Sequence, residues 1–181
     1  MKKLKYQTNK KHKGELIIMD NCLLFSKIKD GAITPSKREE DGCYDIYACF
    51  DDEFIVIQPH TNKLIPTGVA TAFTPKYRLA IRERGSNTKS NLITMAGQID
   101  SGYRGEIFVS LYNGNDIPVE ITKNVTEVTR TEDFIRVPYS KVIAQFAMEE
   151  VPRILVKEIP YDELLNIKSD RGIGALGSSK K

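Results

Sequence analysis

The sequence has few of the side chains that form cross-links or bind zinc. Of its 181 residues, three are cysteines and two are histidines. Cys22, Cys43 and Cys49 are an odd set without a CxxC spacing, so neither a disulfide framework nor a zinc knuckle is indicated. His12 and His60 have no second potential ligand at metal spacing, which argues against a zinc enzyme. We therefore expect any bound metal to be held through oxygen.

Long apolar runs and a strong charge imbalance are also absent. No stretch of about 18 apolar residues occurs for a membrane span, and Met1 is not followed by the apolar run of a signal peptide. We therefore expect a cytoplasmic protein with no membrane contact. The formal net charge of +3 falls short of the basic stripe of a DNA-binding domain, so no stable nucleic-acid partner is expected. The lysine-rich residues 1–14 are interpreted as a solvated terminus rather than a nucleic-acid arm.

The sequence does contain a series of short segments in which apolar and polar residues alternate. Alternation at every second position is typical of β-strands with one buried face. Turn-forming residues separate these segments, which favours an all-β fold of the sandwich, jelly-roll or barrel type. The expected strands are Phe54 to Ile57, Val69 to Phe73, Tyr77 to Ile81, Ile107 to Leu111 and Ile154 to Val156.

The length favours a single domain followed by a tail. We expect residues 1–168 to form the β domain, with one helix of about two turns at 161–168. Residues 115–139 are polar and are predicted to be an insertion, either a hairpin or a docking surface for a protein partner. Residues 169–181 are rich in glycine and serine and are predicted to be a mobile arm.

The first segment that can carry chemistry is Gly97 to Glu106. Asp100 lies at a predicted bend, where a carboxylate can hold a water molecule in line with an electrophile and accept its proton. Tyr103 follows three residues later and can supply a flat wall for a sugar. Viewed alone, Asp-Ser-Gly is also ordinary turn chemistry.

Two further segments carry groups that phosphate oxygens bind. Arg82 to Asn87 combines guanidinium, hydroxyl and backbone N–H donors, although a charged loop has the same composition. Arg171 to Ser179 combines an arginine and hydroxyls with glycines whose backbone can fold around a phosphate chain. It is not a P-loop, because no GK[ST] follows a strand, and a flexible linker is the alternative interpretation.

Taken in order, these segments resemble the trimeric dUTPase family, including its phage or Gram-positive-type members, from about Ala32 to the C-terminus. Five motifs carry the resemblance, and the segment from Gly97 to Glu106 is the most specific because it matches the family pattern GxIDxxYRGE. The five are Asp41 to Ala48 (similar to AGYDLYA), Arg84 to Ser86, Gly97 to Glu106, Val142 to Gln145, and Arg171 to Ser179.

The resemblance implies a jelly-roll-like β-barrel or sandwich that forms a homotrimer with active sites shared between copies. It implies Mg²⁺-dependent hydrolysis of dUTP to dUMP and pyrophosphate, with Asp100 orienting the attacking water. Mg²⁺ would be held mainly by the substrate phosphates and water, with indirect support from Asp45. The arm of one copy would close a site made by the other two. The implied substrate-binding residues are Arg84, Gly85, Ser86, Gly97, Gln98, Ile99, Tyr103, Gln145, Arg171, Leu176, Gly177, Ser178 and Ser179.

Two alternative functions remain at this point. The same motifs also resemble those of dCTP deaminases. That family uses a glutamate where this chain has Ser110, and a serine cannot transfer protons at neutral pH. A weakly active, nucleotide-binding regulatory module of the same fold is the second alternative. It is motivated by departures from the family pattern, with Gly85 in place of a serine, Thr94 in place of an asparagine and Leu176 in place of a phenylalanine.

Overall fold

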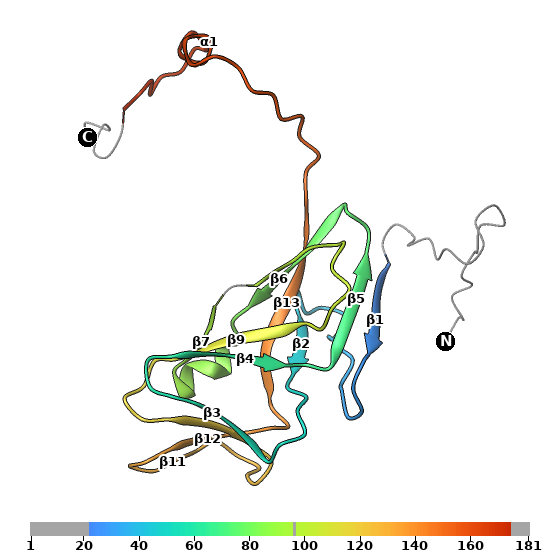
Figure 1. The fold of residues 1–181 in the computed structure, drawn as a ribbon, viewed down its shortest axis with the longest axis vertical. Coiled ribbons are helices and arrows are strands. Elements are labelled where there is room, and N and C mark those ends of the chain that lie inside the picture. The colour runs from blue at the N-terminus through green and yellow to red at the C-terminus, as the bar shows by residue number, and fades with distance from the viewer. Residues whose placement is uncertain (1–21, 96, 175–181) are drawn as a thin grey trace, which may run out of the picture. The chain divides into compact units, whose positions relative to one another are not determined.

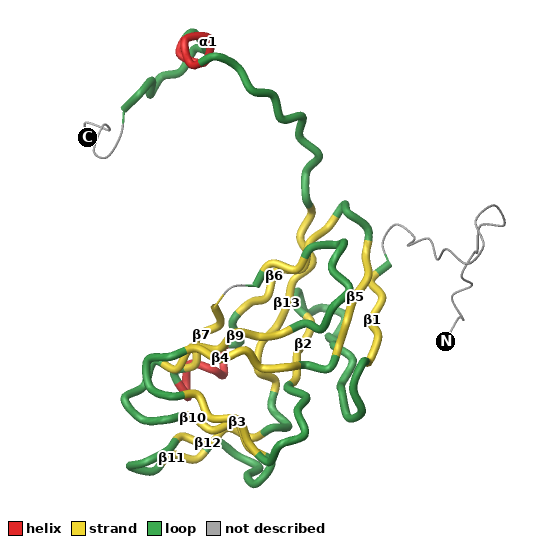
Figure 2. The backbone as a smooth tube through the Cα atoms, in the orientation of Figure 1, coloured by secondary structure: helices red, strands yellow, loops and turns green. Residues whose placement is uncertain are grey.

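The protein was analysed as a computed structural model, which describes residues 22–95 and 97–174. In this part of the chain most regular structure is β-strand, as Figure 2 shows. The elements are β1 (Leu23–Lys27), β2 (Tyr44–Tyr47), β3 (Phe54–Ile57), β4 (Asn62–Pro66), β5 (Val69–Phe73), β6 (Tyr77–Arg82), the 3-10 helix η1 (Gly85–Ser90), β7 (Leu92–Met95), β8 (Gln98–Ile99), β9 (Phe108–Asn113), β10 (Val119–Thr122), β11 (Thr129–Arg130), β12 (Ile135–Pro138), β13 (Val142–Glu150) and α1 (Tyr161–Leu165).

The described strands form small sheets whose order departs from the order of the sequence (Figure 1). The sheets have the orders β1-β5, β11-β12-β10-β3, β2-β13-β6-β8 and β4-β9-β7. Neighbouring strands are antiparallel, except that β10 and β12 run parallel. Strands distant in sequence therefore pair, which is the arrangement of a jelly-roll-like sandwich and confirms the predicted all-β fold.

One hydrophobic core holds these sheets together. Its fully buried members come from both four-stranded sheets and from the β4-β9-β7 sheet. They include Ile46, Ile57, Leu79 and Leu111. The ring of Phe146 on β13 stacks on Tyr44 at 5.2 Å between centroids. Each such side chain stabilises the fold by roughly 1.5–3 kcal/mol through removal of apolar surface from water.

The sequence pattern located several strands correctly. The predicted strands at 54–57 and 69–73 coincide with β3 and β5, and the alternation on β9 leaves Val109 and Leu111 fully buried. The predicted strand at 154–156 is wrong. Its apolar side chains are exposed, and the described part of the chain offers it no neighbouring strand with which to pair. The helix expected at 161–168 is shorter and spans Tyr161–Leu165.

The stretch 115–139 contains the expected hairpin only in part, at β11 and β12. Both of its flanks are core strands, because Val119, Ile121 and Ile135 are at most 1% exposed. β10 pairs with β3 on one side and with β12 on the other, so β10 and β12 are parallel neighbours rather than the two arms of a hairpin. Only β11 and β12 form a short antiparallel pair. The polar character of this stretch thus belongs to the connection between β10 and β12, and a docking role for it stays a prediction.

The chain divides into two compact units, residues 1–151 and 152–181. The first unit holds the β sheets, and the second holds α1 and the start of the predicted arm. No helix within residues 22–95 and 97–174 is long and apolar enough to cross a membrane. The expected cytoplasmic location stays a prediction.

Candidate active site

A polar pocket of about 690 Å³ lies where β2, β13 and the residue before η1 meet. Three of the residues singled out by the sequence line it, namely Asp45, Arg84 and Gln145. Gln145 Nε2 donates a hydrogen bond to Asp45 Oδ1 at 2.7 Å, and Arg84 Nε lies 4.0 Å from the same oxygen. Two hydrogen-bond donors, Arg84 and Gln145, therefore lie beside the Asp45 carboxylate.

Strand pairing explains how these residues meet although they are far apart in sequence. Gln145 lies on β13, an inner strand of its sheet, and is paired with Asp45 on β2 and with Arg82 on β6. Residues directly opposite each other in paired strands carry side chains on the same face. The register therefore places the Asp45 carboxylate beside the Gln145 amide, and the end of β6 brings Arg84 to the same place.

The loop from Arg84 to Ser86 is anchored from both sides. Arg84 Nη1 donates to Ser86 Oγ at 2.9 Å, which joins the guanidinium and the hydroxyl into one unit. The buried Asn87 donates through Nδ2 to the carbonyl oxygen of Ile143 at 2.7 Å, tying η1 to β13. Gly85 is exposed, and a side chain at this position would meet nothing within 4 Å. Packing therefore does not require glycine at this position.

Sequence reasoning missed part of the second wall of the pocket, because Asp41, Gly42 and Cys43 belong to the first family motif whereas residues 36–38 were not singled out. This wall is the loop before β2 and consists of Ser36, Lys37, Arg38, Asp41, Gly42 and Cys43. An isolated bridge between Ser36 and Asp45 closes the loop at its base. The Arg38 guanidinium beside Asp41 lowers the pKa of that carboxyl below its usual value. The run of two basic and three acidic residues at 37–41 was a visible signal, but only the bridge to Asp45 shows that this loop faces the pocket.

The hairpin from Gly97 to Glu106 forms a second surface. β8 pairs with β6, and a turn follows in which the Tyr103 N–H donates to the Asp100 carbonyl oxygen at 3.0 Å. The Tyr103 hydroxyl donates to the carbonyl oxygen of Glu106 at 2.8 Å, which holds the ring against the hairpin. Asp100 is exposed, and its carboxylate has no hydrogen-bond or ion-pair partner among the described residues. An acid with these properties can meet a solvent-borne substrate.

Gly97 is required for the close approach of this hairpin to β6. Its carbonyl oxygen accepts the Ile81 N–H at 2.7 Å, and a Cβ at residue 97 would lie 2.9 Å from Ile81 Cβ and 3.0 Å from the Ile81 carbonyl oxygen. A backbone atom cannot move aside as the end of a flexible side chain can. The close packing of the hairpin on β6 therefore requires glycine at position 97. Glu106 secures the other end by accepting the Gly68 N–H at 2.7 Å.

Within one chain the two surfaces remain separate. The residues that line the pocket include none of Gly97, Gln98, Ile99, Asp100 and Tyr103. The structure therefore brings together Asp45, Arg84 and Gln145 but does not bring the hairpin to them.

The arm is described only in part. Arg171 Nε donates to the carbonyl oxygen of Gly174 at 2.8 Å, forming a local turn in which Gly172 has a φ of +55°. Leu176, Gly177, Ser178 and Ser179 lie outside the described residues. Their predicted contacts, like that of Arg171, stay predictions.

The pocket suits a hard cation that is held mainly by its substrate. Asp41 and Asp45 each supply one carboxylate, and the described residues contain no group of three or more acidic, cysteine or histidine side chains placed to hold a metal. Mg²⁺ keeps several waters and usually takes one or two carboxylates together with substrate phosphates. Two carboxylates in a polar pocket match that preference.

The position relevant to the deaminase alternative carries no acid. Ser110 on β9 is 8% exposed, and its hydroxyl oxygen accepts a hydrogen bond from Asn62 Nδ2 at 3.2 Å. This hydroxyl already takes part in a hydrogen bond between β4 and β9. A serine hydroxyl also cannot replace the carboxylate that transfers protons in a deaminase.

Comparison with solved structures shows the same fold in phage enzymes. A mutant dUTPase of Staphylococcus bacteriophage 80alpha with dUpNHpp superposes with a TM-score of 0.68 at 21% identity, covering 88% of this chain and 98% of that one. The dUTPase from phage phi11 of S. aureus gives a TM-score of 0.61 at 21% identity, covering 77% of this chain and 96% of that one.

Sequence comparison gives closer relatives. The family model dUTPase matches residues 29–126, which include Asp45, Arg84 and the Asp100 hairpin. A deoxyuridine 5'-triphosphate nucleotidohydrolase from Gloeothece citriformis is 33% identical over 161 residues, covering 87% of this chain and 95% of the relative. The enzyme of the same name from Clostridium acetobutylicum is 32% identical over the same shares of both chains. The chain belongs to the dUTPase family.

Proposed function

We propose that this protein hydrolyses dUTP to dUMP and pyrophosphate. The observation that carries the proposal is the pocket in which Arg84 and Gln145 surround the Asp45 carboxylate, combined with an exposed Asp100 on a separate hairpin. The first group supplies donors for phosphate oxygens, and the second supplies an acceptor for the proton of a water. The curated relatives from Gloeothece and Clostridium are deoxyuridine 5'-triphosphate nucleotidohydrolases, which supports the same reaction.

In the proposed mechanism, Asp100 orients a water for in-line attack on the α-phosphorus and accepts its proton. The guanidinium of Arg84, the hydroxyl of Ser86 and the second amide hydrogen of Gln145 donate to the phosphate oxygens. These donors are fixed before the substrate arrives, so they stabilise the charge on the leaving pyrophosphate without rearranging. The proposed closing contacts come from Arg171, Ser178 and Ser179.

The hairpin is proposed to recognise the base and the sugar. The backbone of Gly97, Gln98 and Ile99 would pair with uracil, and the close packing of Gly97 on Ile81 fixes that backbone. Tyr103 is 43% exposed, so its ring presents a face on which deoxyribose can pack. A 2′-hydroxyl or a 5-methyl group would not fit against a backbone and a ring held in this way.

We propose Mg²⁺ as the cofactor. When bound, it would neutralise charge on the triphosphate and fix the geometry of the phosphate chain. Asp45 would support it indirectly through water, since this carboxylate already accepts a hydrogen bond from Gln145. A solved mutant dUTPase of phage phi11 coordinates a structural Mg(II) ion, which supports Mg²⁺ as the metal of this protein.

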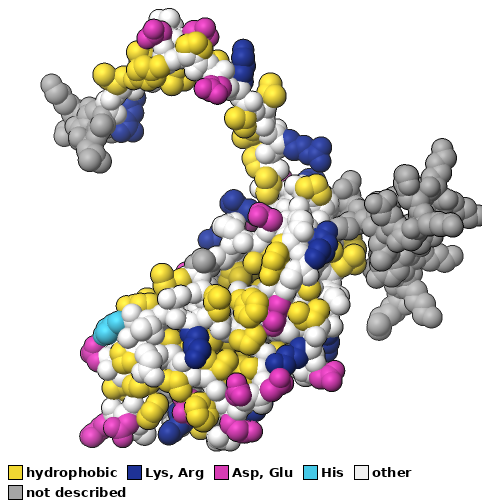
Figure 3. All heavy atoms as spheres, in the orientation of Figure 1, with side chains coloured by type: hydrophobic (Ala, Val, Ile, Leu, Met, Phe, Trp, Pro, Cys, Tyr) yellow, Lys and Arg dark blue, Asp and Glu magenta, His cyan; other side chains and the backbone are white. Residues whose placement is uncertain are grey.

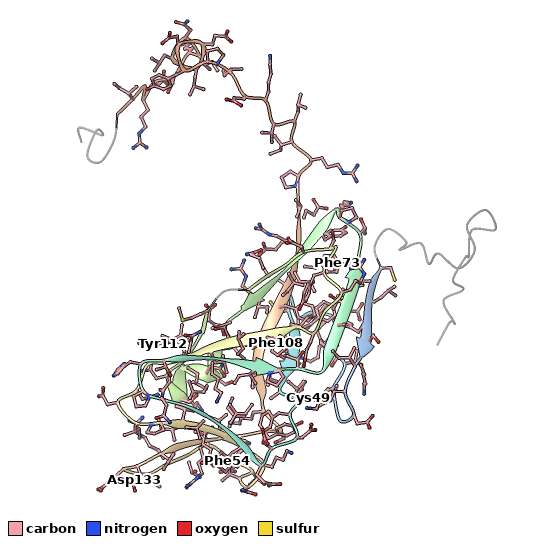
Figure 4. The ribbon with its side chains drawn as sticks, in the orientation of Figure 1. Cys49, Phe54, Phe73, Phe108, Tyr112 and Asp133 are labelled. Atoms are coloured by element: carbon pink, nitrogen blue, oxygen red, sulfur yellow. The ribbon has the colours of Figure 1, made fainter. Side chains whose placement is uncertain are left out.

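We propose a homotrimer, supported by an apolar outer surface on the β4-β9-β7 sheet. The strand registers place Leu64, Ile93, Met95 and Phe108 on the face of this sheet opposite the core, and each is 40–59% exposed. Figure 4 labels Phe108 on β9, and Figure 3, in the same orientation, shows hydrophobic side chains over the middle of the β domain. Exposed apolar groups gathered on one sheet are typical of a subunit interface. A neighbouring copy would then supply the Asp100 hairpin that the pocket lacks.

Hydrolysis in ¹⁸O-labelled water tests the proposed reaction directly. With dUTP and Mg²⁺, attack on the α-phosphorus puts the label into dUMP, and mass spectrometry of both products locates it. Label in pyrophosphate would show attack at the β-phosphorus and would contradict the role of Asp100. Binding of dUTP without any product would identify the protein as the regulatory module instead.

A further inference from the structure

The loop before β2 carries a cation that the proposed mechanism does not use. Arg38 lines the same pocket as Arg84 and Gln145. The loop is anchored at its base, because the Asp45 N–H donates to the Ser36 carbonyl oxygen at 2.9 Å. Arg38 is therefore held two residues from a fixed point on the pocket wall.

The neighbouring lysine is already engaged within the loop. Lys37 Nζ donates to the carbonyl oxygens of Arg38, Glu39 and Asp41, at 3.3, 3.1 and 2.7 Å. An ammonium group has three hydrogens, so these contacts occupy it fully. Lys37 thus stabilises the loop and has no donor left for a ligand.

Arg38 differs because most of its donors are unused. Nε and Nη2 donate to the two carboxylate oxygens of Asp41 at 2.9 and 3.1 Å, which uses two of the five N–H groups of a guanidinium. The Arg38 side chain is 88% exposed, so the ion pair with Asp41 is weak and can rearrange when an anion binds. The remaining hydrogens can meet an anion in the pocket, and guanidinium groups bind phosphate oxygens in pairs.

We propose that Arg38, oriented by Asp41, binds the distal phosphate of the nucleotide and sets the preference for triphosphates over shorter phosphate chains. The inference rests on the proposed function, since it places the phosphate chain in this pocket. Arg84 and Gln145 hold the part of the chain nearest β13, and Arg38 on the outer loop meets the end that extends away from it. A nucleoside monophosphate would not reach Arg38.

Binding measurements on full-length variants test this contact independently of hydrolysis. The ligands are dUpNHpp, a non-hydrolysable triphosphate, and dUMP, each titrated by calorimetry in the presence of Mg²⁺. We expect Arg38→Gln to weaken dUpNHpp binding about 10-fold, because the substitution removes a charged hydrogen bond that solvent exposure has already weakened. The same substitution should leave dUMP binding unchanged. Arg38→Lys keeps the charge without the planar fork, so it should lose less. Arg130→Gln, a matched exposed arginine on β11 outside the pocket, should change neither.

The outcomes separate this proposal from the proposed function. No weakening by Arg38→Gln, or equal weakening of both ligands, overturns the distal-phosphate contact. A wild-type protein that binds both nucleotides but releases no pyrophosphate contradicts the proposed function alone, and the Arg38→Gln comparison still decides the contact. A wild-type protein that does not bind the triphosphate contradicts both.

Discussion

Replacing Asp100 with asparagine is expected to lower the rate of dUTP turnover by about 10²–10⁴-fold, the usual effect of removing a general base. The amide has nearly the same shape as the carboxylate but cannot accept the proton of the attacking water. Because Asp100 is exposed and unpaired among the described residues, the substitution should leave the fold and the affinity for dUpNHpp intact. Steady-state assays of pyrophosphate release measure the loss of turnover, and calorimetry with dUpNHpp measures the affinity separately.

Asp133→Asn provides the matched control for this variant. Asp133 is exposed in the turn between β11 and β12, on a different sheet from the Asp100 hairpin (Figure 4). The same change of charge there should not alter turnover. Full activity of Asp100→Asn would remove this residue from the mechanism, whereas loss of both binding and fold would indicate a structural role.

Mixing two inactive variants is expected to restore activity if the site is shared between copies. Asp100→Asn damages only the hairpin, and Gln145→Ala damages only the pocket. In randomly mixed trimers, about one site in four combines an intact hairpin from one copy with an intact pocket from another. Pyrophosphate release after unfolding and joint refolding should therefore rise from near zero to roughly a quarter of the wild-type value.

A second pair of variants controls for non-specific rescue. Arg84 and Gln145 line the same pocket of one chain, so mixing Arg84→Ala with Gln145→Ala leaves every pocket damaged. This mixture should stay inactive even though copies exchange, which native mass spectrometry can verify. If exchange occurs and the first pair also stays inactive, the hairpin and the pocket do not come from different copies.

Some parts of this molecule could be predicted from the sequence because they depend on local pattern. The alternation around Val109 and Leu111 fixes which face of β9 is buried, and β3 and β5 follow from similar alternation. The match of Gly97 to Glu106 to a known pattern identified the hairpin that the structure shows. Its glycine is explained only by the structure, through its contact with Ile81.

Other parts depended on pairing between distant segments. Ile117, Val119 and Ile121 alternate with other residues as on β9, but the polar composition of the whole stretch hid this signal. The pairing of β10 with β3 and with β12 places it in the core. The apolar run at Ile154 to Val156 has strand-like composition, but a strand also requires a neighbour with free backbone groups. The loop that carries Arg38 faces the pocket only because Ser36 bridges to Asp45.

The most direct test of the account is a panel of dUTP, dTTP, dCTP and UTP, with detection of pyrophosphate and ammonia in the presence of Mg²⁺. The account predicts pyrophosphate release that strongly prefers dUTP, because the hairpin excludes the 5-methyl group of dTTP and Tyr103 disfavours the 2′-hydroxyl of UTP. Ammonia released from dCTP, or equal hydrolysis of dUTP, dTTP and UTP, would contradict it.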